Sequence, residues 1–165
     1  MRALLALAVA SVVAFPAVAA TWTQFTLEPS IWSVEFPGEP VLTTNADAGP
    51  RDLEAVVTMG DAYFVLDVRF LAAGTVDTAG GADAYLMNRR NSAVGKGKLL
   101  SDKGVTLNGY PERDFVFDRG TGYASMRAIL VGNRLYQVLF AAKNAEAVGG
   151  ADAMHFLNSF KLHLN

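Results

Sequence analysis

A strictly alternating run of nine residues places the tightest constraint on how this chain folds. One side of residues 62–70 carries Phe64, Leu66, Val68 and Phe70, and the other carries Tyr63, Val65, Asp67 and Arg69. This period of two predicts a β-strand with one buried face. Gly60 and Asp61 separate the run from residues 53–59, which are also strand-like. A Gly-Asp pair is typical of a two-residue hairpin turn, so the two strands are expected to pair antiparallel.

Three later runs also have the composition of strands, and short glycine-containing turns join them. They span residues 114–118, 123–131 and 134–141. Together they predict a three-stranded antiparallel meander. The middle run has apolar side chains on both faces, with Met126 on one and Ile129 on the other, which indicates that both sides of the sheet are covered. Further strands are predicted at residues 31–36 and 105–108.

Two segments have apolar side chains at helical spacing. The first spans residues 78–94, with Asp77 or Thr78 as its N-cap and Gly95 at its end. The second spans residues 150–159. Because an apolar sheet face must be buried against another layer, these helices are expected to lie on the sheet. We therefore expect an α+β fold, a mostly antiparallel sheet of roughly six to eight strands covered by two main helices in an α/β/α sandwich.

The first residues have the pattern of a secretory signal peptide. Arg2 supplies a basic start, and residues 3–15 form an apolar run in which one serine is the only polar side chain. The small side chains that follow are those a signal peptidase requires, and cleavage is expected after Ala19 or Ala20. Residues 1–20 are therefore predicted to be a cleaved signal peptide of bacterial type. An uncleaved anchor is the alternative, but the run is shorter than the roughly 20 residues that span a bilayer.

Residues 21–165 are expected to form one soluble domain, periplasmic or secreted, without a membrane span. The chain has no cysteine, which excludes a lipid-attachment cysteine and disulfides. Loss of Arg2 leaves 13 of the 14 Lys and Arg side chains against 16 Asp and Glu, a net charge of −3. Because these charges form no concentrated basic face, nucleic acid is not expected as a partner.

Residues with metal-binding or catalytic chemistry are few. His155 and His163, the only histidines, lie eight residues apart with no cysteine to join them, which argues against zinc. Asp114 and Asp118 share one side of a strand, but their Cα atoms would lie about 13 Å apart. A solvated mixed-charge edge is the simpler interpretation, and a weak cation site there stays open. Residues 95–100 lack the third glycine of a nucleotide-binding loop and are expected to form a turn. No catalytic residue, cofactor or metal ligand is predicted.

A local basic cluster is the one candidate for partner binding. Its members fall within 15 residues that contain a single acidic residue, Asp102; they are Arg89, Arg90, Lys96, Lys98 and Lys103. Such a cluster is suited to an acidic partner or an anionic surface. A solvated helix end, where cations complement the helix dipole, is the simpler interpretation.

Four stretches together resemble the Mog/PsbP-like domains, in the same order over nearly the whole of residues 21–165. They are Trp32-Ser-Val-Glu-Phe-Pro-Gly-Glu-Pro40, Gly109-Tyr-Pro-Glu-Arg-Asp-Phe-Val-Phe117, Gly132-Asn-Arg-Leu-Tyr-Gln-Val-Leu-Phe140 and Phe156-Leu-Asn-Ser-Phe-Lys-Leu162. The resemblance implies the fold of a superfamily that includes the extrinsic PsbP proteins of photosystem II, a small-GTPase-binding nuclear protein and many exported bacterial proteins of unknown function. The matched positions are packing and turn residues, so the resemblance identifies no functional residue.

Together, the leader and the resemblance favour an exported, soluble, non-enzymatic domain that binds a protein or envelope partner. The alternative is a small-ligand-binding or hydrolytic protein that uses a cleft between sheet and helices. Fold analogy is a weak guide to function, and the identity of the partner and the oligomeric state are not encoded in any motif of this sequence.

Overall fold

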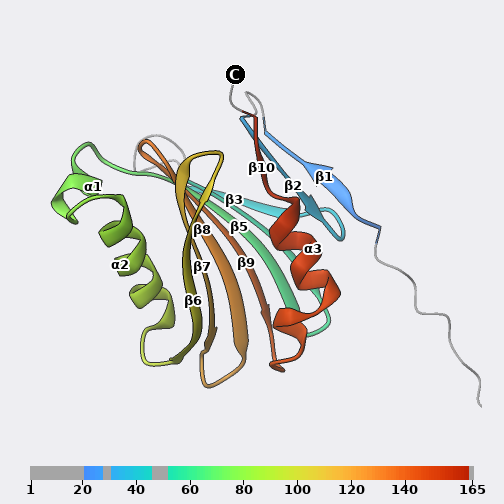
Figure 1. Cartoon of the computed structure of the whole chain (residues 1–165). Coiled ribbons are helices and arrows are strands. Elements are labelled where there is room, and N and C mark those ends of the chain that lie inside the picture. The colour runs from blue at the N-terminus through green and yellow to red at the C-terminus, as the bar shows by residue number, and fades with distance from the viewer. Residues whose placement is uncertain (1–20, 28–30, 46–51, 164–165) are drawn as a thin grey trace, which may run out of the picture.

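A large antiparallel sheet with a layer on each face forms the centre of the molecule (Figure 1). This computed structural model describes residues 21–27, 31–45 and 52–163, so the predicted signal peptide lies outside the described residues. The sheet has the strand order β3-β4-β5-β9-β8-β7-β6. Its strands are β3 (Val41–Asn45), β4 (Asp52–Met59), β5 (Ala62–Phe70), β6 (Lys98–Leu107), β7 (Tyr110–Asp118), β8 (Tyr123–Val131) and β9 (Arg134–Ala142).

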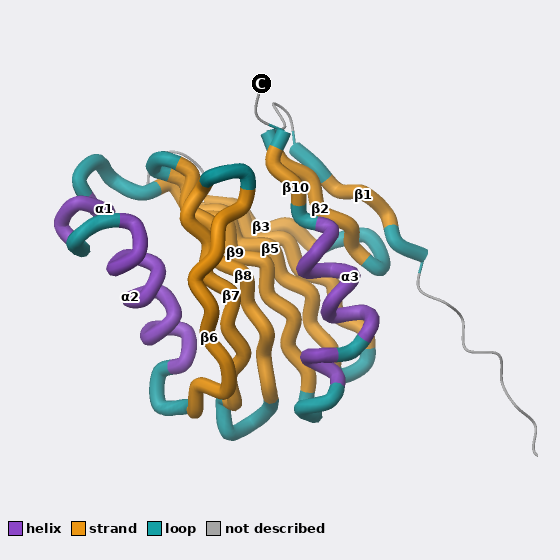
Figure 2. Tube along the Cα trace, in the orientation of Figure 1, coloured by secondary structure: helices purple, strands orange, loops and turns teal. Residues whose placement is uncertain are grey.

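The two faces of this sheet are covered by different elements. Figure 2 shows helices α1 (Thr75–Thr78) and α2 (Ala82–Val94) on one side. The other side carries α3 (Ala151–Ser159), a short 3₁₀ helix (Ala147–Gly149) and a three-stranded sheet. That small sheet has the order β1-β2-β10, with β1 (Thr23–Phe25), β2 (Trp32–Phe36) and β10 (Lys161–Leu162). The predicted α+β fold is confirmed, with a seven-stranded main sheet.

The alternating run and the meander are confirmed as strands. β4 and β5 pair antiparallel with Val57 opposite Phe64, and Gly60 in the turn between them has a φ of 57°, which favours glycine. β7, β8 and β9 form the predicted meander. Because β5 pairs with β9, the hairpin and the meander join into one sheet.

Each side of the sheet has its own hydrophobic core. On the α3 side, the Phe64 ring contacts the Phe140 and Phe156 rings at centroid distances of 5.0 and 5.4 Å, and Phe36 lies 5.1 Å from Phe156. On the α2 side, Leu86 is buried with a group contributed by the sheet, Phe115, Phe117, Ala124, Met126, Ala128, Leu130 and Leu135. The two-sided pattern expected for β8 is therefore confirmed, since Met126 and Ile129 belong to opposite cores.

The first predicted helix begins later than expected. Gly80 and Gly81 have φ values of 94° and 100°, which interrupt the segment and leave a single helical turn, α1, before α2. Gly81 is the N-cap of α2, so the predicted caps Asp77 and Thr78 are wrong. The predicted end at Gly95, with a φ of 54°, is confirmed. No helix in the described ranges is long and apolar enough to cross a membrane.

The two edge strands of the main sheet depart most from expectation. Residues 98–107 form the continuous strand β6, where a turn at 95–100 and a short strand at 105–108 were predicted. A tight turn follows, in which Asn108 and Gly109 have φ values of 51° and 83°. Most β6 side chains are exposed, so no burial pattern marks it as a strand. β3, on the opposite edge, has the same property and was not predicted.

Candidate functional site

Helix α2 covers only part of its face of the main sheet. It packs mainly on β6, β7 and β8, while β3, β4 and β5 carry no helix on that face among the described residues. We call this uncovered area the open face. It comprises the side chains of Val41, Thr43, Glu54, Val56, Tyr63, Val65, Asp67 and Arg69, and it meets the α2 layer at β9 through Leu139 and the buried Gln137.

Strand register arranges the open face into rows that cross the strands. One row is apolar and runs from the sheet edge toward α2, through Val41, Val56, Val65 and Leu139. The neighbouring row is polar and runs through Thr43, Glu54, Asp67 and Gln137. Since directly opposed side chains of an antiparallel pair are in contact, each row is a continuous strip.

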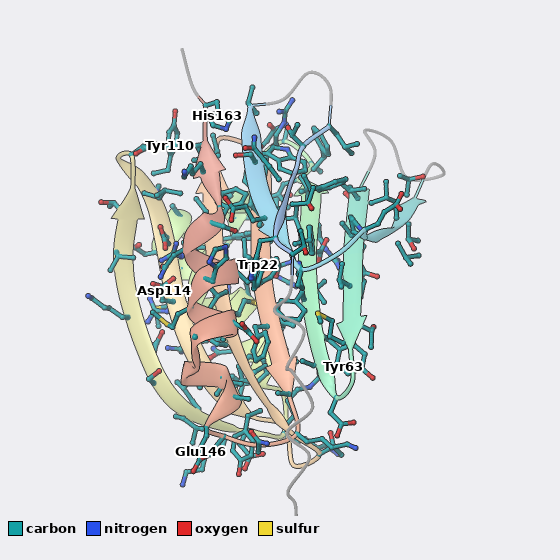
Figure 3. The ribbon with its side chains drawn as sticks, turned by 90° about the vertical axis from the view of Figure 1, so that its right-hand side faces the viewer. Trp22, Tyr63, Tyr110, Asp114, Glu146 and His163 are labelled. Carbon is teal, nitrogen blue, oxygen red and sulfur yellow. The ribbon has the colours of Figure 1, made fainter. Side chains whose placement is uncertain are left out.

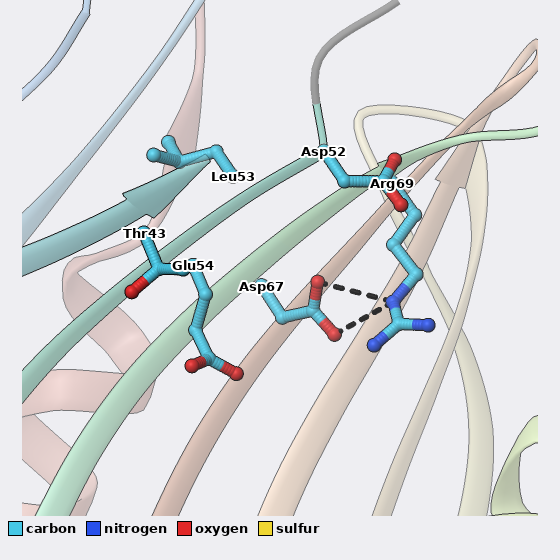
Figure 4. Close-up of a pocket in the computed structure, with 6 residues that line it drawn as sticks. All are labelled: Thr43, Asp52, Leu53, Glu54, Asp67 and Arg69. Atoms are coloured by element: carbon cyan, nitrogen blue, oxygen red, sulfur yellow. Dashed lines mark hydrogen bonds and ion pairs between the residues drawn. The ribbon is translucent and has the colours of Figure 1, made fainter. Parts of the chain in front are cut away.

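The polar row is part of a hydrogen-bonded chain that ends on α2. Arg69 Nε donates to both carboxylate oxygens of Asp67, at 2.9 and 3.2 Å (Figure 4). Gln137 Nε2 donates to Asp67 Oδ2 at 2.7 Å. Arg89 of α2 donates to Gln137 Oε1 from Nη2 at 2.8 Å and from Nε at 3.3 Å. Gln137 is 3% exposed and both of its amide atoms are bonded, so its orientation is fixed.

The charged groups in this hydrogen-bonded chain have different partners. Desolvation raises the pKa of the Asp67 carboxyl above its usual value, although the charge of Arg69 acts in the opposite direction. Arg89 contacts a neutral amide, and no ion pair among the described residues includes it. Its guanidinium lines the groove between α2 and the sheet, where its charge acts on the Asp67 carboxylate across Gln137 and lowers the Asp67 pKa.

That groove and a neighbouring hollow are two concave parts of the open face. The groove has a volume of about 290 Å³, with Val65, Leu139 and Phe117 among its apolar lining residues and Arg89 and Arg119 among its polar ones. The hollow, of about 160 Å³, lies over β3, β4 and β5 and is lined by Thr43, Asp52, Leu53, Glu54, Asp67 and Arg69 (Figure 4). Both lie at or below the usual range for sites that enclose a small molecule, roughly 300–1,000 Å³.

The predicted basic cluster does not form one surface. Arg89 is directed toward Gln137, whereas Arg90 pairs with Asp102, which Arg113 also contacts at 2.6 and 2.7 Å. Lys103 lies on the opposite face of the sheet, where it lines a hollow beside α3. Lys98 begins β6, and Lys96 precedes it in the turn after α2. Partner binding by the five residues as a group stays a prediction.

Asp114 and Asp118 have separate structural roles. Arg127 Nε donates to Asp114 Oδ1 at 3.2 Å, and the Gly120 backbone N–H donates to Asp118 Oδ1 at 2.7 Å. Within the described ranges, no group of three or more His, Asp or Glu side chains is placed to hold a metal ion. In this structure Asp114 therefore contacts an arginine, and Asp118 stabilises a turn.

A buried carboxyl that the sequence did not single out lies beside Asp114. Glu112 is 4% exposed, and its Oε1 lies 2.7 Å from Arg127 Nε without an aligned hydrogen bond. Desolvation raises the Glu112 pKa to about 7, with Asp114 adding to the effect and Arg127 opposing it. Arg127 also donates to the Leu157 carbonyl at 3.0 Å, which connects this cluster to α3.

Both histidines contact β2 of the small sheet. His155 Nε2 lies 2.6 Å from Glu35 Oε2, and its ring stacks on Trp22 at a centroid distance of 4.1 Å. His163 Nε2 lies 2.8 Å from Ser33 Oγ. The side chain of His155 is 44% exposed.

Solved structures with the same architecture identify the fold of this chain. No family model matches the sequence, and no curated protein is similar to it. The solution structure of cyanobacterial PsbP (CyanoP) from Synechocystis sp. PCC 6803 matches at a TM-score of 0.58 and 9% identity, covering 92% of this chain and 98% of that one. The chain has a PsbP-like fold.

Two further solved structures are similar at lower scores. The Ran-binding protein Mog1p of Saccharomyces cerevisiae has a TM-score of 0.48 and 7% identity, over 87% of this chain and 96% of that one. A protein of Bacteroides thetaiotaomicron has a TM-score of 0.49 and 10% identity, over 86% of this chain and 48% of that one. At these identities the PsbP-like likeness concerns the fold alone.

Proposed function

We propose that this chain is an exported, non-enzymatic PsbP-like domain that binds a protein partner through the open face. The observation that carries the proposal is the apolar row from Val41 to Leu139, which runs out from α2 to the sheet edge without a covering element among the described residues. Val41 and Tyr63 are 73% and 48% exposed. An exposed apolar strip beside polar groups is characteristic of a surface that another protein covers.

The charged groups of the open face support binding more than catalysis. Asp67 is held by Arg69 and Gln137, and the Gln137 amide is fully engaged. A general acid or base must exchange a proton with a substrate, whereas these groups bond to one another. Arg89 is the cation best placed to meet a carboxylate of the partner, because it lines the groove and pairs with no carboxylate among the described residues.

A photocrosslinking pair tests the location of the partner. A crosslinking amino acid is placed at Tyr63 on the open face, and at Met154 on α3 as a control with the same exposure, 48%. We expect one protein to crosslink from Tyr63 and not from Met154. Equal crosslinking from both positions, or none from Tyr63, would contradict the proposal.

Two neighbouring arginines then test affinity for the purified partner. Arg89→Gln removes the cation that lines the groove, whereas Arg90→Gln removes one that faces β6. We expect Arg89→Gln to weaken binding about tenfold, a typical cost for a charged contact at the centre of an interface. Arg90→Gln is expected to change the affinity less than twofold. The reverse order would place the partner on the other side of α2.

Export is tested separately. The basic start, apolar run and small residues of the leader support cleavage near Ala20. We expect the intact mass of the exported protein to correspond to a chain that begins near Thr21. A species that retains Met1 would rule out cleavage.

A small-ligand or hydrolytic role is a second candidate, favoured by the groove of about 290 Å³ between α2 and β9. Under this alternative, a small anion with an apolar part would raise the melting temperature of the wild-type protein. Arg89→Gln would abolish that rise. A compound with this behaviour, together with no crosslinked protein at Tyr63, would favour the alternative.

A further inference from the structure

The two edges of the main sheet differ in how well they are protected from pairing with another strand. β6 carries Lys98, Asp102 and Lys103, and its register shifts between Leu99 and Ser101. Charged side chains and bulges are the usual devices that keep an edge strand from pairing. β3, at the other edge, has the sequence Val-Leu-Thr-Thr-Asn, with no charged residue and no register shift.

β3 is exposed on both of its faces. Val41 is 73% exposed on the open face, and Leu42 is 45% exposed on the opposite one. Thr43 and Thr44 are also exposed. No described strand pairs with the outer side of β3. An edge of this kind presents backbone N–H and C=O groups to an incoming strand, and side chains of high β-propensity on both faces.

Two carboxylates of β4 lie beside this edge, and Arg69 of β5 lines the same hollow but pairs with Asp67. β4 contributes Asp52 and Glu54, and neither β3 nor β4 contains Lys or Arg within its bounds. Asp52 Oδ1 accepts a hydrogen bond from the Phe70 backbone N–H at 3.0 Å. Glu54 is exposed opposite Thr43, and no ion pair among the described residues includes it. The edge is therefore uncharged along β3 and carries two carboxylates one strand inward.

We propose that β3 is the docking edge for an extended basic segment of the partner, which adds to the main sheet as an eighth strand. This inference rests on the proposed function and specifies the chemistry of the partner. An added strand would lie about 4.8 Å from β3 and about 9.6 Å from β4. A Lys or Arg of the partner segment that lies opposite Thr43 would extend its side chain over the small Thr43 side chain, so that its charged group reaches the Glu54 carboxylate. The residue two positions along the segment faces Val41 and is apolar.

A second copy of the chain fits this edge less well. Antiparallel pairing of β3 with itself, centred on Thr43, would place the two Glu54 side chains on one face about 14 Å apart, with no cation supplied by either β3 or β4. Like charges across an interface disfavour association. A basic segment replaces that repulsion with attraction.

The test uses the exported protein and a nine-residue peptide that alternates valine with lysine. We expect the outward-facing amides among residues 41–45 to exchange with deuterium at least tenfold more slowly when the peptide is bound, while the amides of β6 are unchanged. A peptide with glutamate in place of lysine is expected not to bind. A peptide N-methylated along one edge keeps its charge but loses strand pairing, and is also expected not to bind.

Two carboxylate variants test the role of Glu54. Glu54→Gln is expected to weaken peptide binding threefold to tenfold, as loss of one partly exposed charge pair. Glu146→Gln makes the same change of charge at the far end of the molecule (Figure 3) and is expected to have no effect. Equal loss in both variants would show that the attraction comes from net charge and would overturn the inference.

Other results would also overturn it. These are equal binding of the N-methylated peptide, no slowing of exchange in β3, or a dimer in sedimentation without peptide that already protects residues 41–45. The proposed function is judged by the Tyr63 crosslinks. If a partner crosslinks at Tyr63 but hydrogen exchange in β3 is unchanged, the open face remains the proposed binding surface and strand addition at β3 is ruled out.

Discussion

Arg89 on α2 directs two hydrogen-bond donors, at 2.8 and 3.3 Å, to the single amide oxygen of Gln137 on β9. Gln137 also donates a hydrogen bond to Asp67 on β5. One buried amide therefore connects α2, which mainly covers β6, β7 and β8, to a carboxylate that lies two strands beyond β8. The open face and the α2 layer are therefore joined by polar contacts as well as by packing.

Gln137→Leu is predicted to destabilise the protein by about 1–3 kcal/mol. The change keeps the size of the side chain but removes a donor from Asp67 and the acceptor of Arg89, and both groups are partly buried. Urea unfolding of the variant gives the free energy. Ser92→Ala, which removes an exposed hydroxyl bonded to the Asn88 carbonyl, is the control, with an expected change within about 0.5 kcal/mol. A Gln137→Leu variant as stable as this control would show that the amide contributes nothing.

Glu112 is predicted to make the stability depend on pH below neutrality. Its pKa is raised from 4.5 to about 7 in the folded protein, so the folded state binds more protons than the unfolded state between these values. The contribution of Glu112 to the free energy of unfolding is therefore largest below about pH 4.5. It falls as the pH rises and levels off above about pH 7.

Glu112→Gln tests this directly, because a neutral amide of similar shape does not titrate. Relative to wild type, the variant is expected to gain stability on going from pH 5 to pH 8, measured by urea unfolding at both pH values. Glu39→Gln, at an exposed carboxylate, is the control and should follow the wild-type curve. If Glu112→Gln also follows that curve, the Glu112 pKa is not raised in the folded state.

Phe156→Ala is predicted to cost about 3–5 kcal/mol, as is typical for removal of a buried aromatic ring. Phe156 is fully buried, with its ring 5.1 Å from Phe36 and 5.4 Å from Phe64. Met154→Ala on the same helix removes a side chain that is 48% exposed, and should cost less than about 1 kcal/mol. Thermal unfolding followed by circular dichroism distinguishes the two. Equal losses of stability in the two variants would indicate that Phe156 does not anchor α3 on the sheet.

Gly97→Ala is predicted to destabilise the turn before β6 by about 1–3 kcal/mol. A Cβ atom at this position would lie 2.1 Å from the Asp118 carbonyl oxygen and 2.9 Å from that of Val94, so the backbone would have to move. Gly149→Ala is the control, because its Cβ would meet no atom within 4 Å and the residue does not need a positive φ. There we expect no loss, or a gain of up to about 1 kcal/mol from reduced unfolded-state entropy. Chemical denaturation of both variants measures the difference.

The central strands could be predicted from the sequence because they have distinct inner and outer faces. Phe64, Leu66 and Val68 alternate with partly exposed residues, and the structure has the same strand bounds, Ala62–Phe70. β3 and β6 lack this contrast, since few of their side chains are buried, and no period marks them. The start of α2 was misplaced because the helical spacing continues through Gly80 and Gly81, whose backbone conformation ends the first turn.

The candidate site was less accessible to sequence reasoning than the fold. Arg89 was singled out for its charge, but its contact with Gln137 depends on where α2 crosses the sheet. Asp67 and Gln137 are 70 positions apart in the chain and become neighbours through the pairing of β5 with β9. Glu112 lies before the predicted strand at residues 114–118, and it is buried because β7 begins earlier, at Tyr110. Register between distant strands creates these contacts, and no local pattern encodes it.

The pairing of β2 with β10 places Ser33 opposite Lys161. The small sheet thus joins a strand from near the start of the described residues to one from near their end. β2 contributes Trp32, Val34 and Phe36 to the core that also contains Phe156 and Phe160. During synthesis or translocation from the N-terminus, β2 must wait for about 125 further residues before its partner emerges. A chain stalled short of β10 would keep that aromatic cluster open to water, which makes late closure of the α3 side an inherent property of this topology.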